Sequence, residues 1–158
     1  MTQKDKELLL ADLSARLPYG LICDRLGMHY PLIEIDIKRE LVYLLRDDNY
    51  VPYSILRGDI IKPYLRPMFS MTEKEAKEIA TLHGLKNILS VKITDEYIDV
   101  IIDDGFSSTE KITLWYDEII SSIEIFDYLN AHHFDYRGLI PKGLALEAPK
   151  GMYKEEQQ

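Results

Sequence analysis

Apolar side chains recur along this chain with two different periods, and each period predicts a different element. Three stretches carry apolar residues every three to four positions, which is typical of one face of a helix. Each stretch begins with a Ser or Thr followed three residues later by an acid, the pattern of a capping box. The helices are predicted over residues 3–17, from Thr72 to about His83, and over about 122–133 after Ser121. In the first of them, Asp12 and Arg16 form an i,i+4 pair on a face other than the leucine face.

Strict alternation of apolar and polar residues predicts strands between these helices. The first helix is followed by a meander of three strands, and the second helix by another meander of three. Turn residues separate neighbouring strands in both meanders. The strands are predicted over residues 20–26, 28–37 and 41–45, and over residues 88–94, 97–102 and 111–116.

The remaining segments lack a regular period. Residues 46–70 contain three prolines and a glycine that interrupt every repeat, so this segment is predicted to be irregular, with an extended crossing at 62–68. Residues 138–146 predict a C-terminal hairpin, and residues 150–158 a polar, frayed tail. Strands grouped between helices favour an α+β fold with antiparallel sheets, built as a single domain over residues 1–149.

The net charge of −8 is concentrated in one region. Residues 95–127 hold ten acids and one base, Lys111, which gives this segment −9 and leaves +1 for the rest of the chain. Such a field repels nucleic acid and anionic membranes, so neither is an expected partner, whereas a basic protein or cations would be attracted. The simplest interpretation is a solvated face of strands and turns.

The densest group of reactive side chains lies at residues 130–138, directly after the third predicted helix. It contains the catalytic candidates His132, His133, Asp135 and Arg137. On a continuing helix the two imidazoles would point about 100° apart and could not share a metal ion. If the helix ends between them, the histidines and Asp135 could converge. The alternative is structural: a histidine in the last helical turn, Phe134 in the core, and Asp135 and Arg137 bonded to the loop backbone.

Other polar residues carry weaker signals. His29 and His83 are isolated from each other and from the cluster, and the single cysteine, Cys23, stands in an alternating strand as a small buried residue would. Asp103-Asp104-Gly105 and Asp47-Asp48-Asn49 are typical of plain turns. Because the sequence also lacks the common nucleotide, hydrolase and zinc motifs, no cofactor and no metal are predicted.

Tyrosine is unusually frequent, with 11 residues against 4 phenylalanines and one tryptophan. Tyrosine offers a large contact area at low entropic cost and is common in protein interfaces. The irregular middle segment combines tyrosine with arginine, so it is the predicted binding surface. Its candidate residues are Tyr50, Tyr53, Arg57, Tyr64 and Arg66.

Distinctive sequence segments in the middle and in the last third of the chain resemble those of a known group of proteins. Residues 129–140 (LNAHHFDYRGLI) and 142–149 (KGLALEAP), with 61–68 (IKPYLRPM) and 70–72 (SMT), resemble an uncharacterised family of small proteins from gut bacteria and their prophages. The resemblance implies a mobile-element context, and it assigns no role to any residue. The first 55 residues and the acidic meander do not contribute to it.

Together these observations favour a cytoplasmic, non-catalytic domain that binds a protein partner, with an undetermined oligomeric state. The cytoplasmic expectation rests on the charged first residues, the absence of a long apolar stretch and the lone cysteine. Two alternatives remain open: a metal-dependent or His/Asp acid–base enzyme with its site at residues 132–137, and an acidic mimic of nucleic acid. The mimic requires carboxylates arrayed along one exposed face.

Overall fold

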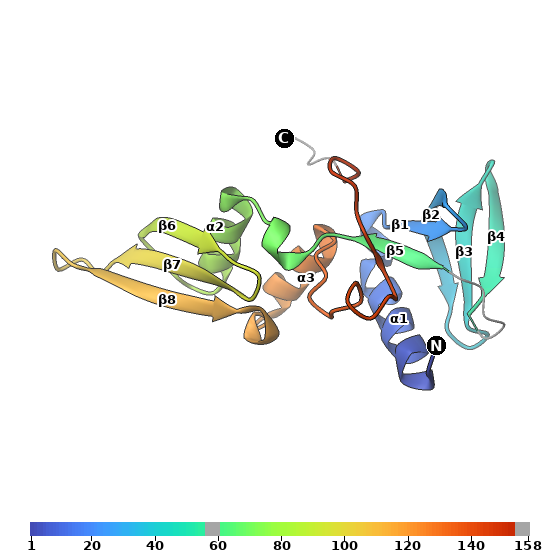
Figure 1. Ribbon diagram of the computed structural model, residues 1–158, viewed down its shortest axis with the longest axis horizontal. Coiled ribbons are helices and arrows are strands. Elements are labelled where there is room, and N and C mark those ends of the chain that lie inside the picture. Colours follow the sequence, from blue (N-terminus) through green and yellow to red (C-terminus); the bar gives the residue numbers. More distant parts are fainter. Residues whose placement is uncertain (56–60, 154–158) are drawn as a thin grey trace. The chain divides into compact units, whose positions relative to one another are not determined.

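The computed structural model describes residues 1–55 and 61–153, which form helices and two β-sheets (Figure 1). The predicted α+β class is therefore confirmed, as are three α-helices within the described residues. The chain divides into two compact units. Unit 1 comprises Met1–Arg66 and Asn130–Gln158, and unit 2 comprises Pro67–Leu129. In the sequence, unit 2 is thus an insertion between two parts of unit 1.

Unit 1 contains the larger sheet, whose strands lie in the order β4-β3-β2-β1-β5-β9. The first four strands form an antiparallel meander, β5 pairs antiparallel with β1, and β9 pairs parallel with β5. Three of the meander strands were predicted. The bounds are β1 Ile22–Arg25, β2 Met28–Asp36, β3 Leu41–Arg46, β4 Asn49–Ser54, β5 Lys62–Leu65 and β9 Leu146–Glu147.

Helix α1 (Gln3–Arg16) supplies the main apolar face that packs against this sheet. Its capping box is formed as predicted, because the Thr2 hydroxyl accepts from the Asp5 amide and the Asp5 carboxylate accepts from the Thr2 amide. The helix passes into a short 3₁₀ turn, η1 (Leu17–Tyr19), and Gly20 ends it with φ +67°.

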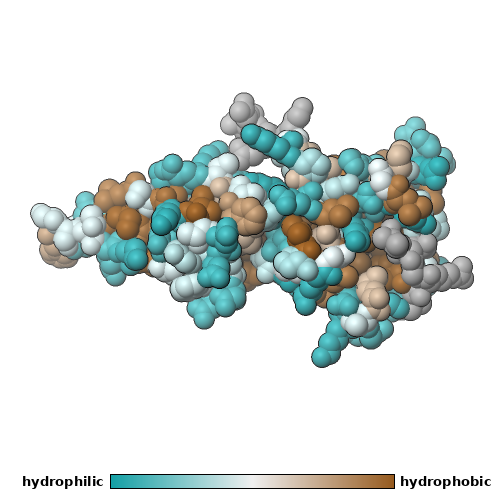
Figure 2. All heavy atoms as spheres, viewed as in Figure 1, coloured by the Kyte–Doolittle hydropathy of each residue, from teal (hydrophilic) through white to brown (hydrophobic). Residues whose placement is uncertain are grey.

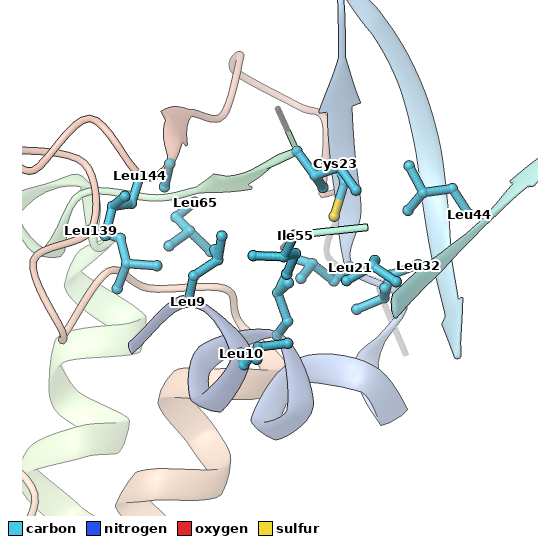
Figure 3. Close-up of a cluster of buried hydrophobic side chains, with 14 residues drawn as sticks. Leu9, Leu10, Leu21, Cys23, Leu32, Leu44, Ile55, Leu65, Leu139 and Leu144 are labelled. Atoms are coloured by element: carbon cyan, nitrogen blue, oxygen red, sulfur yellow. The ribbon is translucent and has the colours of Figure 1, made fainter. Parts of the chain in front are cut away.

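The core of unit 1 forms where α1, the sheet and the returning chain meet (Figure 3). Leu9 and Leu10 of α1 lie toward Leu21 and Leu65 from the sheet region, and Leu139 and Leu144 close the cluster from the C-terminal segment. Cys23 is buried in the same cluster, as predicted for a small hydrophobic residue. Burial raises the pKa of its thiol, which keeps it protonated and inert.

The prediction that residues 46–70 are irregular was wrong for the segment that forms β4, whereas β5 lies within the extended crossing predicted at residues 62–68. Asp47 and Asp48 both have positive φ (47° and 62°), the conformation of a two-residue hairpin turn. Such a turn makes Arg46 and Asn49 a hydrogen-bonded pair, so Pro52 falls at a non-hydrogen-bonded position opposite Tyr43. The missing N–H of Pro52 therefore belongs to the outer edge of β4, where proline is tolerated.

Pro52 consequently protects an exposed sheet edge. Replacement Pro52→Val would restore an outward N–H on β4 and make the edge competent for pairing with another chain. We expect the variant to self-associate at concentrations where the parent chain does not, as measured by sedimentation velocity. Pro31→Val, inside the sheet on β2, is the matched control and should not change the oligomeric state. Equal association of both variants would contradict the edge-protection role.

Unit 2 consists of the three-stranded antiparallel sheet β6-β7-β8 and the helices beside it. The predicted second meander is confirmed, and the capping box of α2 forms between Thr72 and Glu75. Gly84 follows the helix with φ +87°. The bounds are η2 Met68–Ser70, α2 Glu73–Leu82, β6 Ile88–Ile93, β7 Tyr97–Asp103, β8 Thr109–Trp115, η3 Tyr116–Glu118 and α3 Ile123–Ala131.

The strand register of this sheet gives it two different faces. Cross-strand partners Val91, Val100 and Ile112 lie on one face, next to the Ile93, Ile98 and Leu114 row, and this apolar face packs near α2. The opposite face carries polar residues mixed with a few large apolar ones. Its members are Ser90, Lys92, Tyr97, Asp99, Ile101, Lys111, Thr113 and Trp115. Figure 2 shows hydrophobic residues interspersed with polar ones over these strands.

Helix α3 differs from its predicted bounds at both ends. The side chain of Ser122, rather than Ser121, caps the helix by accepting from the Ile125 amide, while Ser121 contacts His83 through a hydrogen bond of 3.2 Å. The helix ends at Ala131 instead of continuing to residue 133. His133 adopts φ +58°, a left-handed conformation that terminates the helix.

The predicted C-terminal hairpin was also wrong. Residues 139–145 form consecutive turns closed by backbone bonds from Gly143 to Ile140 and from Leu144 to Leu139, and β9 then joins the sheet beside β5. The expected frayed tail is ordered as far as the structure describes it. The hydroxyl of Tyr153 donates to the carbonyl of Tyr64 (2.8 Å) and accepts from the amide of Ile22 (3.1 Å).

In the described part of the chain, no helix combines the length and apolar composition needed to span a bilayer.

Candidate functional site

The proposed Tyr/Arg binding surface does not assemble as one surface. Tyr50 is 63% exposed on the edge strand β4, whereas Tyr64 on β5 is only 7% exposed. Tyr53 lies under the guanidinium of Arg25 (4.9 Å), and Arg66 lies over the ring of Phe134 (4.2 Å). Arg57 lies outside the described residues. The reason is that β5 is an inner strand, which turns this part of the middle segment into core.

The cluster at residues 130–138 is built around a charged residue of α1. Arg16 and Asp12 are both 0% exposed and form a two-pronged ion pair, Nε–Oδ2 2.8 Å and Nη2–Oδ1 2.9 Å. The same Nη2 donates to the carbonyl oxygen of Phe134 at 2.7 Å. The predicted i,i+4 pair therefore exists, but it is buried and ties α1 to the segment after α3.

Aromatic and amide groups complete the surroundings of this guanidinium. The centroid of the Tyr136 ring lies 5.3 Å from the guanidinium carbon of Arg16 and 5.1 Å from that of Arg137. The Tyr136 hydroxyl donates to Asn130 Oδ1 (2.8 Å), and Nε of Arg137 donates to that hydroxyl (3.2 Å). Arg137 also lies 3.5 Å from Asp12. The side chains of Asn130, Tyr136 and Arg137 are therefore bonded to other groups of the fold.

Asp135 acts as a backbone cap, as the structural interpretation predicted. Its two carboxylate oxygens accept from the amides of Leu139 and Ile140, each at 2.8 Å. Burial raises the pKa of this carboxyl, and the two amide bonds act in the opposite direction. Phe134 beside it is fully buried, also as that interpretation predicted. Asp135 is therefore committed to the loop at 135–140.

His133 is shut away from solvent. Its ring stacks on Tyr153 with centroids 3.8 Å apart, and among the described residues its Nδ1 has no hydrogen-bond partner. Burial, with the positive charge of Arg16 second, lowers its pKa to about 3, so the ring is neutral at physiological pH. The ring of His132 instead stacks on that of Phe134, with the ring centroids 6.4 Å apart. The two imidazoles do not share a ligand.

These positions do not support a metal or acid–base site at residues 132–137. Within the described ranges, no three side chains of His, Cys, Asp or Glu come close enough to hold a metal ion. A buried, neutral imidazole and a carboxylate capping backbone amides present no reactive atom to a substrate.

A group of exposed charged side chains lies instead on unit 2, which contains the acidic segment found in the sequence. Unit 2 holds 13 acids and 5 bases, a net −8, whereas the rest of the chain holds 14 of each. Two hydrogen bonds join the turn after β6 to the turn after β8. The Tyr116 amide donates to the carbonyl of Glu96 (3.0 Å), and the Tyr116 hydroxyl donates to the carbonyl of Thr94 (2.8 Å). Four exposed carboxylates surround this junction, here termed the acidic end: Asp95, Glu96, Asp117 and Glu118.

An aromatic pair borders the acidic end. Tyr97 and Trp115 are cross-strand partners whose rings meet edge to face, with centroids 4.9 Å apart. Trp115, the single tryptophan of the chain, remains 45% exposed. The acids were predicted from the sequence, but this aromatic pair was not. The available signal was the hairpin register, which sets residue 97 opposite residue 115.

Comparison with known proteins yields no family model, no curated protein and no solved structure that matches this chain.

The buried ion pair generates a stability prediction. Asp12→Asn leaves the Arg16 guanidinium buried without its counterion, so we expect a loss of about 3–5 kcal/mol in the free energy of unfolding. Glu73→Gln removes the acid of an i,i+4 pair with Lys77 (2.9 Å) that is exposed on α2. This matched control should cost no more than about 0.5 kcal/mol. Urea unfolding measures both, and similar losses would show that burial does not govern the pair.

His133 generates a prediction of pH dependence. Its folded-state pKa of about 3 lies below the ordinary value of 6.5, so the unfolded chain binds the proton more tightly. The stability that the fold gains by burying a neutral His133 is fully present above pH 6.5, and it is lost as the pH falls toward 3. His133→Asn, which tolerates the positive φ, removes it.

Urea unfolding between pH 7 and pH 4 tests this directly. The unfolding equilibrium constant of the parent chain should rise with acidity more steeply than that of the variant, by up to about tenfold per pH unit. Parallel curves for the two proteins would refute a neutral, buried His133.

Proposed function

We propose that the protein is a non-catalytic binding protein whose unit 2 receives a basic segment of a partner protein. The observation that carries the proposal is the Tyr97–Trp115 pair, in which an exposed Trp115 and a half-buried Tyr97 lie beside the four carboxylates of the acidic end. A lysine or arginine side chain is attracted to an aromatic face and to a neighbouring carboxylate at the same time. Tryptophan, tyrosine and charge-complementary rims are common features of protein interfaces.

The distribution of charge supports a basic partner. All of the net negative charge resides in unit 2, so its field would accelerate the approach of a cationic protein and orient it toward this unit. The resemblance noted for the middle and C-terminal segments would place such a partner in a bacterial host or its phage.

The two alternatives receive less support. An enzyme at residues 132–137 would need reactive groups in contact with solvent, and Asp135 and His133 are buried. A nucleic-acid mimic would need a continuous row of carboxylates. On unit 2 acids lie at both ends of the sheet, and on the open face between these ends Lys92 and Lys111 accompany a single acid, Asp99.

The single tryptophan provides a direct test. Titration with a synthetic peptide of alternating arginine and glycine at low ionic strength should change the Trp115 fluorescence saturably, and added salt should weaken binding. The double variant Asp117→Asn, Glu118→Gln should weaken binding about fivefold, because each exposed charge contributes up to about 1 kcal/mol.

A charge-matched control separates the acidic end from net charge. Asp47→Asn with Asp48→Asn removes two exposed acids from unit 1, at positions whose positive φ asparagine accepts. Its affinity for the peptide should equal that of the parent chain. No fluorescence change at low salt, or equal weakening in both double variants, would overturn the proposal.

A further inference from the structure

We propose that Asp24, His29 and Tyr64 form a binding site for a transition-metal ion on the outer face of the unit 1 sheet. The three residues come from adjacent strands β1, β2 and β5. Asp24 and His29 are direct cross-strand partners, and Tyr64 reaches Asp24 diagonally from the other side of β1. Strand register therefore directs all three side chains to one face, opposite to the buried Cys23.

The donor atoms already converge. The Tyr64 hydroxyl oxygen lies 2.9 Å from Nε2 of His29 and 3.2 Å from Oδ1 of Asp24. Ligand atoms bound to one metal ion at about 2.0–2.2 Å are themselves separated by about 3 Å. An ion could thus replace the hydrogen bonds between these groups with only small movements of the side chains.

The surroundings fix two of the donors and leave the third accessible. Tyr64 is almost fully buried, and its ring meets that of His29 edge to face at 4.8 Å. The second carboxylate oxygen of Asp24 accepts from the Gly27 amide (3.4 Å), which orients the first toward Tyr64. The imidazole of His29 is exposed, so an ion can reach the group from solvent.

The donor set determines the class of ion. One imidazole nitrogen, one carboxylate and one phenol oxygen suit iron(III) and copper(II), which bind N and O donors strongly. A tyrosine phenol is protonated at neutral pH in the absence of an ion. Binding therefore releases the Tyr64 proton to solvent as the phenolate–metal bond forms.

Lys62 lies on the same face, as the register partner of Asp24. Its ammonium opposes a cation at this position, and replacing it should increase affinity. An increase in affinity would be informative. If Lys62 contributed only to the fold, its replacement would not strengthen the binding of a metal ion.

The sequence did not connect His29 with Asp24 or Tyr64. Asp24 lies 5 residues before His29 in the sequence and Tyr64 lies 35 residues after it, and these separations match no common ligand spacing. Tyrosine is also a less usual ligand than His, Cys, Asp or Glu, so a pattern of those four residue types does not find the group.

Copper(II) alone is the probe for a decisive experiment. Titration of the full chain at pH 7 should produce a visible phenolate-to-copper charge-transfer band at one equivalent. Tyr64→Phe should abolish the band, His29→Gln and Asp24→Asn should each weaken binding at least tenfold, and Lys62→Gln should tighten it. Tyr50→Phe, which alters an exposed tyrosine on β4, should retain the band.

Circular dichroism confirms that each variant is folded, and His29→Gln at an exposed position keeps the test valid if Tyr64→Phe does not fold. Absence of the band in the parent chain would overturn the proposal. A band that persists in Tyr64→Phe, or copper binding unaffected by His29→Gln, would show an adventitious ion only and would also overturn it.

Discussion

The rest of unit 1 depends on the hydrogen bonds that the buried guanidinium of Arg16 makes to Asp12 and Phe134. A charge in a fully buried position is costly by several kcal/mol unless it is paired and hydrogen-bonded. Helix α1 supplies the counterion itself, one turn earlier at Asp12, and the returning chain supplies the Phe134 carbonyl. The Arg16–Phe134 bond joins positions 118 residues apart in the sequence. Helix α1 can therefore complete the hydrogen bonds of Arg16 Nη2 only when the C-terminal part of the chain has folded against it.

This requirement explains the composition of the 130–138 segment. Arg66 and Phe134 form a parallel bridge, in which the Arg66 amide donates to His133 and the Asp135 amide donates to Arg66, each at 2.8 Å. The chain leaves unit 1 after Arg66 and returns at Asn130, so this bridge holds the exit and the return of the insertion together within unit 1. Residues 133–135, which resemble a catalytic group in the sequence, thus stabilise the place where the chain leaves and re-enters unit 1.

Local signals accounted for most of the elements but not for their assembly. The capping boxes at Thr2 and Thr72 and the alternation of the second meander depend on residues close in sequence, and each was predictable. Strand β5 was not, because its place between β1 and β9 is fixed by contacts with residues 23 and 146. Pro52 misled the prediction because its effect depends on which edge of the strand it faces, and periodicity does not reveal this.

The candidate sites follow the same division. The sequence found the acids of unit 2, since charge can be counted, but the aromatic pair beside them exists only through the register of β7 and β8. It found the reactive side chains at residues 130–138 and could not show that Asp12 and Arg16 of α1 engage them. In both cases the missing information was a pairing between distant residues. A chemical group on the surface and the same group in the core have identical sequence patterns.

The two units differ in whether folding buries their charged and aromatic side chains or leaves them exposed. In unit 1 the cluster of charged and aromatic residues at 130–138 is consumed by packing, so its density says nothing about a ligand. In unit 2 thirteen acids repel one another without a compensating number of bases, which opposes compaction of that unit. The apolar face of the sheet beside α2 supplies its cohesion, and the charged ends make no such contribution. This charge distribution, which does not stabilise the fold and lies beside the exposed Trp115, is the reason for proposing that unit 2 binds another molecule.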